Sequence, residues 1–161
     1  MKDLLIYLRL PRYLKEWLEF HLGTPVRFPE RSYENELLHT LLTKRPASVQ
    51  PVKPTADSVA LVITDCRHRK PEHYNYLGIR GQRVMISSIE GLFRLDLWSS
   101  CAALIHSKGE LNKGLDEWCA RSGISLDARA AVRQKFYRMR REYQAHGIVV
   151  GKCYKKSAII V

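Results

Sequence analysis

The sequence has no run of about 20 consecutive apolar residues, the length that a helix needs to cross a bilayer. Its first residues are largely apolar, but Arg9 and Arg12 interrupt them and no small-residue cleavage site follows. The pattern of a secretory signal peptide is therefore incomplete. We expect neither a membrane-spanning helix nor a cleaved leader.

Cysteine is also scarce. The four thiols form no CxxC pair, which argues against a disulfide framework or a common zinc pattern. Cys66 lies near His68 and His73, but this spacing matches no usual zinc site and no fourth ligand is evident. We expect a reduced, cytoplasmic protein with no metal and no other cofactor. The scattered cysteines are Cys66, Cys101, Cys119 and Cys153.

Motifs of common enzymes are missing. The sequence contains no Walker A loop, no nucleotide-binding GxGxxG and no GxSxG. Asp65 together with His68 or His73 resembles a fragment of a nuclease site, but no second acid lies nearby to complete a two-metal centre. We expect no catalytic residue. A nucleic-acid-processing enzyme acting through residues 65–76 stays open as an alternative.

Acidic residues are few compared with basic ones. The chain has 27 Lys and Arg against 16 Asp and Glu, a formal net charge of +11. Such an excess attracts polyanions over about one Debye length. Nucleic acid is the first partner that this charge suggests, and an anionic membrane surface is the second.

The N-terminal part predicts strands interleaved with helices. Apolar residues favour strands over 3–10 and 59–64, the latter buried on both faces, and a short strand over 24–28. Pro11 and Gly23 bound one predicted helix, and Ser32 is a good N-cap for another. Prolines make residues 44–58 a loop and a candidate boundary. Pro71 is expected to open a short helix.

The C-terminal part predicts helices. Two are expected between residues 81 and 107, the second capped by Asp96, and then helices over 111–122 and 127–145 joined by a turn at Gly123. The tail from residue 148 is β-prone. We therefore expect an α+β fold. Residues 1–58 form an N-terminal part with its linker, and residues 59–161 comprise the buried strand, the helical part and the basic tail. One compact domain that includes both parts is the alternative.

The helix expected over 127–145 has two contrasting sides. At about 100° per residue, one stripe is apolar and predicts a core-facing side: Ala128, Val132, Phe136, Met139 and Tyr143. The other side is rich in Arg, with Gln and Tyr interleaved, and is expected to be exposed: Arg129, Arg133, Gln134, Tyr137, Arg138, Arg140 and Arg141.

This side chain chemistry suits DNA. A helix fits the major groove, Arg bonds guanine in bidentate fashion and Gln bonds adenine. A short helix, a turn with Gly and a basic helix follow each other as in a helix-turn-helix. We expect the residues near the helix start to contact bases, namely Arg129, Arg133, Gln134 and Tyr137. An ordinary helical hairpin with a solvated basic face is the alternative.

Two further basic clusters are candidates for phosphate contacts. The first comprises Arg67, Arg69 and Lys70, with Arg80 and Arg83 near Tyr74 and Tyr76. The second comprises Lys152, Lys155 and Lys156 beside Tyr154. Such loops and tails often hold the DNA backbone beside a reading helix. Each cluster taken alone is equally compatible with a solvated loop.

Several short segments carry a resemblance. They are Tyr7-Leu8-Arg9-Leu10-Pro11, Gly23-Thr24-Pro25-Val26-Arg27, Tyr74-Asn75-Tyr76-Leu77 and the pair Leu97-Trp98. With the late helix pair, they resemble uncharacterised small proteins carried by phages and conjugative elements of Bacteroides-type gut bacteria. The resemblance implies a DNA-associated role in a mobile element and nominates no catalytic residue.

These observations lead to one functional hypothesis. The sequence predicts a non-catalytic protein that binds double-stranded DNA, with a transcriptional or a replication and maintenance role. A homodimer agrees with it, since many helix-turn-helix proteins read paired half-sites. A protein interaction module that docks an acidic partner on the basic surface is the rival.

Overall fold

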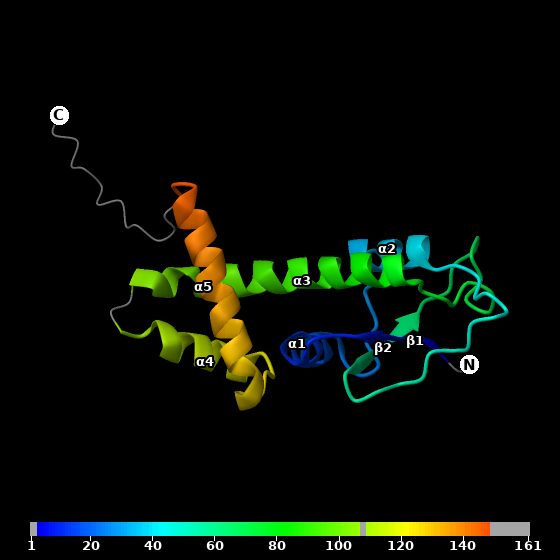
Figure 1. Ribbon diagram of the computed structural model, residues 1–161, viewed down its shortest axis with the longest axis horizontal. Coiled ribbons are helices and arrows are strands. Elements are labelled where there is room, and N and C mark those ends of the chain that lie inside the picture. The colour runs from blue at the N-terminus through cyan, green and yellow to red at the C-terminus, as the bar shows by residue number, and fades with distance from the viewer. Residues whose placement is uncertain (1–2, 107–108, 149–161) are drawn as a thin grey trace. The chain divides into compact units, whose positions relative to one another are not determined.

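The computed structural model describes residues 3–106 and 109–148. The fold is α+β, as the sequence predicts, with a two-stranded antiparallel sheet followed by a mostly helical C-terminal part (Figure 1). The chain divides into two compact units, Met1–Arg94 and Leu95–Val161, which we call unit 1 and unit 2.

The sheet of unit 1 consists of strands β1 (Leu4–Arg9) and β2 (Ser58–Ile63). They pair antiparallel, with Leu4 opposite Ile63. β2 is almost wholly buried, as its unbroken apolar run predicts, whereas β1 alternates between buried and more exposed residues. Both strands that the sequence predicts at these positions are confirmed.

The prediction of a third strand over residues 24–28 is wrong. Only a single parallel bridge forms, between Val26 and Leu61. Pro25 and Pro29 flank this bridge, and proline has no backbone N–H to donate to a ladder. The segment therefore lies beside β2 without extending the sheet.

Helices α1 (Arg12–Leu22) and α2 (Tyr33–Leu41) form where the sequence predicts them. Gly23 ends α1 with φ +83°, a left-handed conformation that glycine adopts without strain. The Ser32 hydroxyl accepts a hydrogen bond of 3.2 Å from the backbone N–H of Asn35, which makes Ser32 the N-cap of α2.

Two expectations about the middle of the chain are wrong. Pro71 opens a turn and not a helix. Asp96 caps nothing, because a single 23-residue helix, α3 (Ile79–Cys101), passes straight through it. The reason is an apolar stripe that continues every four residues without interruption, so that nothing favours a break. Its buried members are Met85, Ile89, Phe93 and Leu97.

The division into units differs from the expected boundary after residue 58. Residues 44–57 form a loop with no regular helix or strand, as predicted, but this loop joins α2 to β2 inside unit 1. Because β2 pairs with β1, it folds with the N-terminal part. The division falls between Arg94 and Leu95, within α3.

Unit 2 continues from the end of α3 through four short elements. These are η1 (Ala102–His106), α4 (Leu111–Arg121), η2 (Leu126–Ala128) and α5 (Arg129–Ala145). The predicted helix pair is present, although α5 starts two residues later than expected because η2 forms a 3₁₀ turn. The two helices run in different directions (Figure 1). Membership of the helix-turn-helix class stays a prediction.

The turn after α4 follows the predicted pattern. Gly123 has φ +73°. The backbone N–H of Ile124 donates to the carbonyl of Cys119 at 2.9 Å, and the Ile124 side chain is buried. A left-handed glycine followed by a buried apolar residue is a common helix ending, and here it directs the chain into η2.

Glycine within α4 has a steric cause. A Cβ atom on Gly114 would lie 2.5 Å from Cδ1 of Leu104 and 3.3 Å from its Cγ. Glycine therefore allows the η1 leucine to pack against the α4 backbone. This contact explains why α4 tolerates a residue that costs about 1 kcal/mol relative to Ala in a helix interior.

Candidate nucleic-acid interface

Helix α5 concentrates positive charge, with six basic residues and one acid over 17 positions. Its packed side agrees with the predicted stripe, since Ala128, Val132, Phe136 and Met139 are buried. Tyr143, the last member of that stripe, is 37% exposed. The ring of Trp98 lies 5.4 Å from that of Phe136 and 4.7 Å from that of Tyr143. These contacts hold α5 against the end of α3.

One row of polar α5 residues is partly covered, and two of its members contact α4. The Arg133 Nε lies 3.8 Å from the Oδ1 of Asp116, and both side chains are only 38% exposed. One turn later, the Tyr137 hydroxyl donates a 2.6 Å hydrogen bond to the Oδ1 of Asn112. Arg129 is half-buried and its Nε is fully buried. These three residues are therefore less open than the sequence predicts, and their contact with DNA stays a prediction.

A second row remains open and unpaired. Gln134, Arg138 and Arg141 follow each other at positions i, i+4 and i+7, and all three are exposed. We call these three residues the outer row. In the described ranges 3–106 and 109–148, no ion pair or hydrogen bond engages the guanidinium group of Arg138 or Arg141. The outer row is thus the part of the predicted basic face that is free to meet an anion.

Arg140 belongs to the other row. It follows Arg133 and Tyr137 at helical spacing and is half-buried. Within the described part of the chain it has no ion pair, so its charge also adds to the positive potential of this end of α5.

Sequence reasoning missed two features of this interface. Asp116 on α4 pairs with Arg133. Counting the acids of the α5 segment alone does not reveal this partner. Ala130 lies one turn before Gln134 and is also exposed, so a small side chain precedes the outer row on the same side of α5. The adjacent small residues Ala130 and Ala131 within a basic helix are the sequence signal that indicates this feature.

The first of the other basic clusters is largely used inside unit 1. Nη1 of Arg69 lies within 3.2 Å of the carbonyl oxygens of His39, Thr40 and Leu42, at the C-terminal end of α2. Arg69 therefore satisfies carbonyls that a helix end leaves unpaired. Lys70 pairs with Asp65 at 3.4 Å. Arg67 is exposed, and no partner is recorded for it among the described residues.

Aromatic rings near this cluster stack with cations. The ring of Tyr74 has the Lys44 Nζ and the Arg69 guanidinium each 5.6 Å from its centroid. Arg80 and Arg83 are exposed on the first turns of α3, in a different part of unit 1. The residues that form one cluster in sequence therefore have separate roles. Arg69 bonds the end of α2, Lys70 pairs with Asp65, and the others are exposed. The cluster of Lys152, Lys155 and Lys156 lies outside the described residues.

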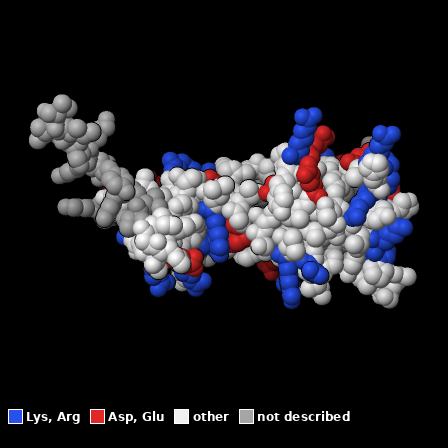
Figure 2. Space-filling view, turned by 90° about the horizontal axis from the view of Figure 1, so that it is seen from above, with Lys and Arg blue, Asp and Glu red and all other residues white. Residues whose placement is uncertain are grey.

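Figure 2 shows how Lys and Arg side chains are distributed on one face. Basic side chains are spread over this face, and the acidic areas between them are small. This face agrees with the net charge, and α5 is the described element where bases most outnumber acids.

A buried polar network connects α2 with the end of β2. The Thr64 hydroxyl donates to the Oδ1 of Asn35 at 3.1 Å, and it lies 2.8 Å from the Nε2 of His39. Because the single hydroxyl proton of Thr64 goes to Asn35, the Nε2 of His39 is the donor to Thr64. The network fixes the His39 ring beside Arg69, where a positive imidazole is disfavoured.

We expect unit 1 to lose stability as the pH falls below about 6.5, the ordinary pKa of histidine. Burial first, and the charge of Arg69 second, lower the pKa of His39, while Asp65 opposes them. Below 6.5, and down to this lowered pKa, the unfolded chain binds a proton at position 39 that the folded chain does not bind. Acidification in this window therefore favours unfolding.

Hydrogen exchange of the α2 amides at about pH 7.5 and 5.5, corrected for intrinsic rates, measures this effect. In the His39→Gln variant the loss of protection between the two pH values should be smaller. An equal loss in both proteins would exclude His39 as its source.

The thiols of Cys101 and Cys119 are buried. Burial raises the pKa of Cys101 to about 12 and that of Cys119 to about 11, so both thiols stay protonated near neutral pH. Within residues 3–106 and 109–148, Cys66, Cys101 and Cys119 are unbridged, and no three His, Cys, Asp or Glu side chains gather in a way that could hold a metal ion.

The remaining findings concern membranes and known proteins. Over the part of the chain that the structure describes, no helix has the length and apolar character needed to span a bilayer. Comparisons with models of protein families, with curated proteins and with solved structures gave no match.

Proposed function

We propose that this chain binds double-stranded DNA without catalysing a reaction, and that the outer row of α5 contacts the DNA. The observation that carries the proposal is a row of exposed side chains, Gln134, Arg138 and Arg141, whose arginines have no partner among the residues that the structure describes. On a mixed surface, so many arginines beside so few acids favour a polyanionic partner.

The outer row offers DNA a different set of side chains from the set that the sequence predicts near the start of the helix. Gln134 offers the bidentate amide that reads adenine, while Arg138 and Arg141 suit phosphate oxygens or guanine. Ala130 leaves room for the backbone to approach a thymine methyl group. Arg133 and Tyr137 serve instead to hold α5 on α4, which makes the row a preorganised surface.

The wider role follows from the resemblance noted in the sequence. We propose a regulatory or maintenance function on a mobile element, with a homodimer placing two copies of α5 on paired half-sites. The supporting observations are the basic helix, the short turn that precedes it and the net charge of +11.

Fluorescence anisotropy with a labelled duplex of about 20 bp, two turns of DNA, tests this function. We expect the affinity to fall with salt, with a logarithmic slope of about −2 or steeper, because two arginines would neutralise two phosphates. Absence of binding at about 50 mM salt, or an affinity that salt does not change, would contradict the proposal. If polyglutamate competes as well as duplex DNA, an acidic protein partner is favoured instead.

A further inference from the structure

Strand β1 is an open edge of the sheet. β2 pairs with one side of β1, and no other described segment pairs with its second side. The backbone N–H of Leu10 donates to Asp57 at 3.0 Å, immediately beyond the last pair of the ladder. In an antiparallel ladder, bonded and non-bonded pairs alternate. The N–H and C=O groups of Leu5, Tyr7 and Arg9 therefore point away from β2.

The opposite side of β2 supports this assignment. Val26 exchanges backbone hydrogen bonds with Ala60 and Val62, at 2.8 and 2.9 Å. These two residues lie opposite Tyr7 and Leu5 in the register. Since residues of a non-bonded pair direct their backbone groups outward on both strands, the β1 edge carries unused donors and acceptors in the described chain.

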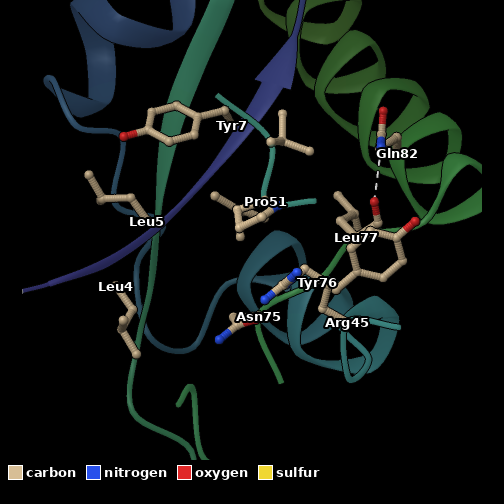
Figure 3. Close-up of a pocket in the computed structure, with 11 residues that line it drawn as sticks. Leu4, Leu5, Tyr7, Arg45, Pro51, Asn75, Tyr76, Leu77 and Gln82 are labelled. Atoms are coloured by element: carbon tan, nitrogen blue, oxygen red, sulfur yellow. Dashed lines mark hydrogen bonds between the residues drawn. The ribbon is translucent and has the colours of Figure 1, made fainter. Parts of the chain in front are cut away.

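A cavity of about 270 Å³ lies beside this edge. Figure 3 shows Leu4, Leu5 and Tyr7 along β1 on one side of it, and Tyr76 and Leu77 on the other. Leu4 and Leu5 are each 36% exposed, although both are large and apolar. The volume is below the roughly 300 Å³ where small-molecule pockets begin. It suits one or two side chains of an extended peptide.

The polar side chains that line the cavity favour a ligand with a negative charge. Arg45 is its one charged lining residue, and no acid is present in the described lining. One guanidinium nitrogen of Arg45 donates to the carbonyl of Val49, which leaves its other N–H groups available. The amide of Gln82 is engaged by the Leu77 carbonyl at 2.9 Å. A carboxylate on the ligand would therefore complement the positive charge of Arg45.

We propose that this groove binds an extended segment of a partner protein, which adds to β1 as a new strand and presents an acidic side chain to Arg45. The outward backbone groups provide the hydrogen bonds, and the apolar walls take alternate side chains. A second copy of the chain matches less well, because the strand that it would add, Leu4–Arg9, carries no acidic side chain for Arg45.

Selection from a displayed library of short random peptides tests the proposal. We expect the recovered peptides to alternate apolar residues and to contain Asp or Glu. Leu5→Pro removes one outward N–H and leaves the ladder with β2 intact, since proline is tolerated at an edge. It should weaken peptide binding about tenfold, whereas Leu5→Ala, which keeps the N–H, should weaken it less. Arg45→Gln should weaken only acidic peptides.

A measurement on the peptide covers the case in which Leu5→Pro does not fold. N-methylation of alternate residues removes peptide N–H groups, and one of the two alternate sets should abolish binding while the other is tolerated. Binding that neither set affects would overturn strand addition. Failure to enrich any peptide over the Leu5→Pro protein would also overturn it. A wild-type dimer that Leu5→Pro dissociates would assign the edge to a second copy.

Discussion

The double variant Arg138→Gln and Arg141→Gln is expected to bind duplex DNA on the order of 100-fold more weakly than the wild type at about 50 mM salt. Each phosphate contact contributes a factor of about ten at this salt concentration, because it releases condensed counterions. Both guanidinium groups are exposed and unpaired in the described chain. Anisotropy titrations at several salt concentrations measure the affinity, and the slope should become shallower by about two.

Arg133→Gln is the matched control on the same helix. It removes one positive charge, as each half of the double variant does, but from a side chain that pairs with Asp116 at 3.8 Å. We expect a small change in DNA affinity and a modest loss of stability. If Arg133→Gln weakens binding as strongly as the double variant, the interface lies at the start of α5 and not along the outer row.

The Phe136→Ala variant should destabilise unit 2 by about 3–5 kcal/mol. The Phe136 side chain is fully buried, and its ring contacts that of Trp98 with centroids 5.4 Å apart. Truncation leaves a cavity between α5 and the end of α3, which the backbone cannot close fully. Amide hydrogen exchange over α4 and α5 should show protection falling by about two to four orders of magnitude.

Tyr143→Ala separates this packing effect from a general sensitivity of α5. Its ring also contacts Trp98, at 4.7 Å, but it is 37% exposed. An aromatic pair of this kind contributes about 1 kcal/mol, so protection should fall by less than about tenfold. Equal losses in the two variants would show that Phe136 is not the centre of the unit 2 core.

Local signals were sufficient for most elements. Helices α1 and α2 and the turn after α4 each have a glycine or a serine whose backbone role depends only on neighbouring residues. Gly23 and Gly123 adopt positive φ where the sequence predicts helix ends, and Ser32 caps α2. Such features are readable because their cause lies within a few residues of chain.

Features that depend on distant residues were not predictable in this way. Asp96 has the side chain of a good N-cap, but whether a helix starts there is decided by the core on which it packs. Arg69 bonds α2 carbonyls about thirty positions earlier, and Arg133 pairs with Asp116 on another helix. Spacing within one segment cannot reveal such partners, because they depend on how separate elements meet.

The candidate interface illustrates the same limit. Helical periodicity correctly separated the apolar side of α5 from its polar side. It could not divide the polar side into a row that packs on α4 and a row that stays open, since that requires the position of Asn112 and Asp116. The outer row is therefore a product of tertiary structure.

The close approach of Leu104 to Gly114 couples two positions that lie in different elements. A larger residue at 114 needs a smaller or differently oriented one at 104, and a smaller residue at 104 removes the reason for glycine. The two positions therefore behave as one steric unit during sequence divergence. A side chain at position 114 is accommodated once residue 104 has become smaller or has turned away, so the order of the two substitutions matters.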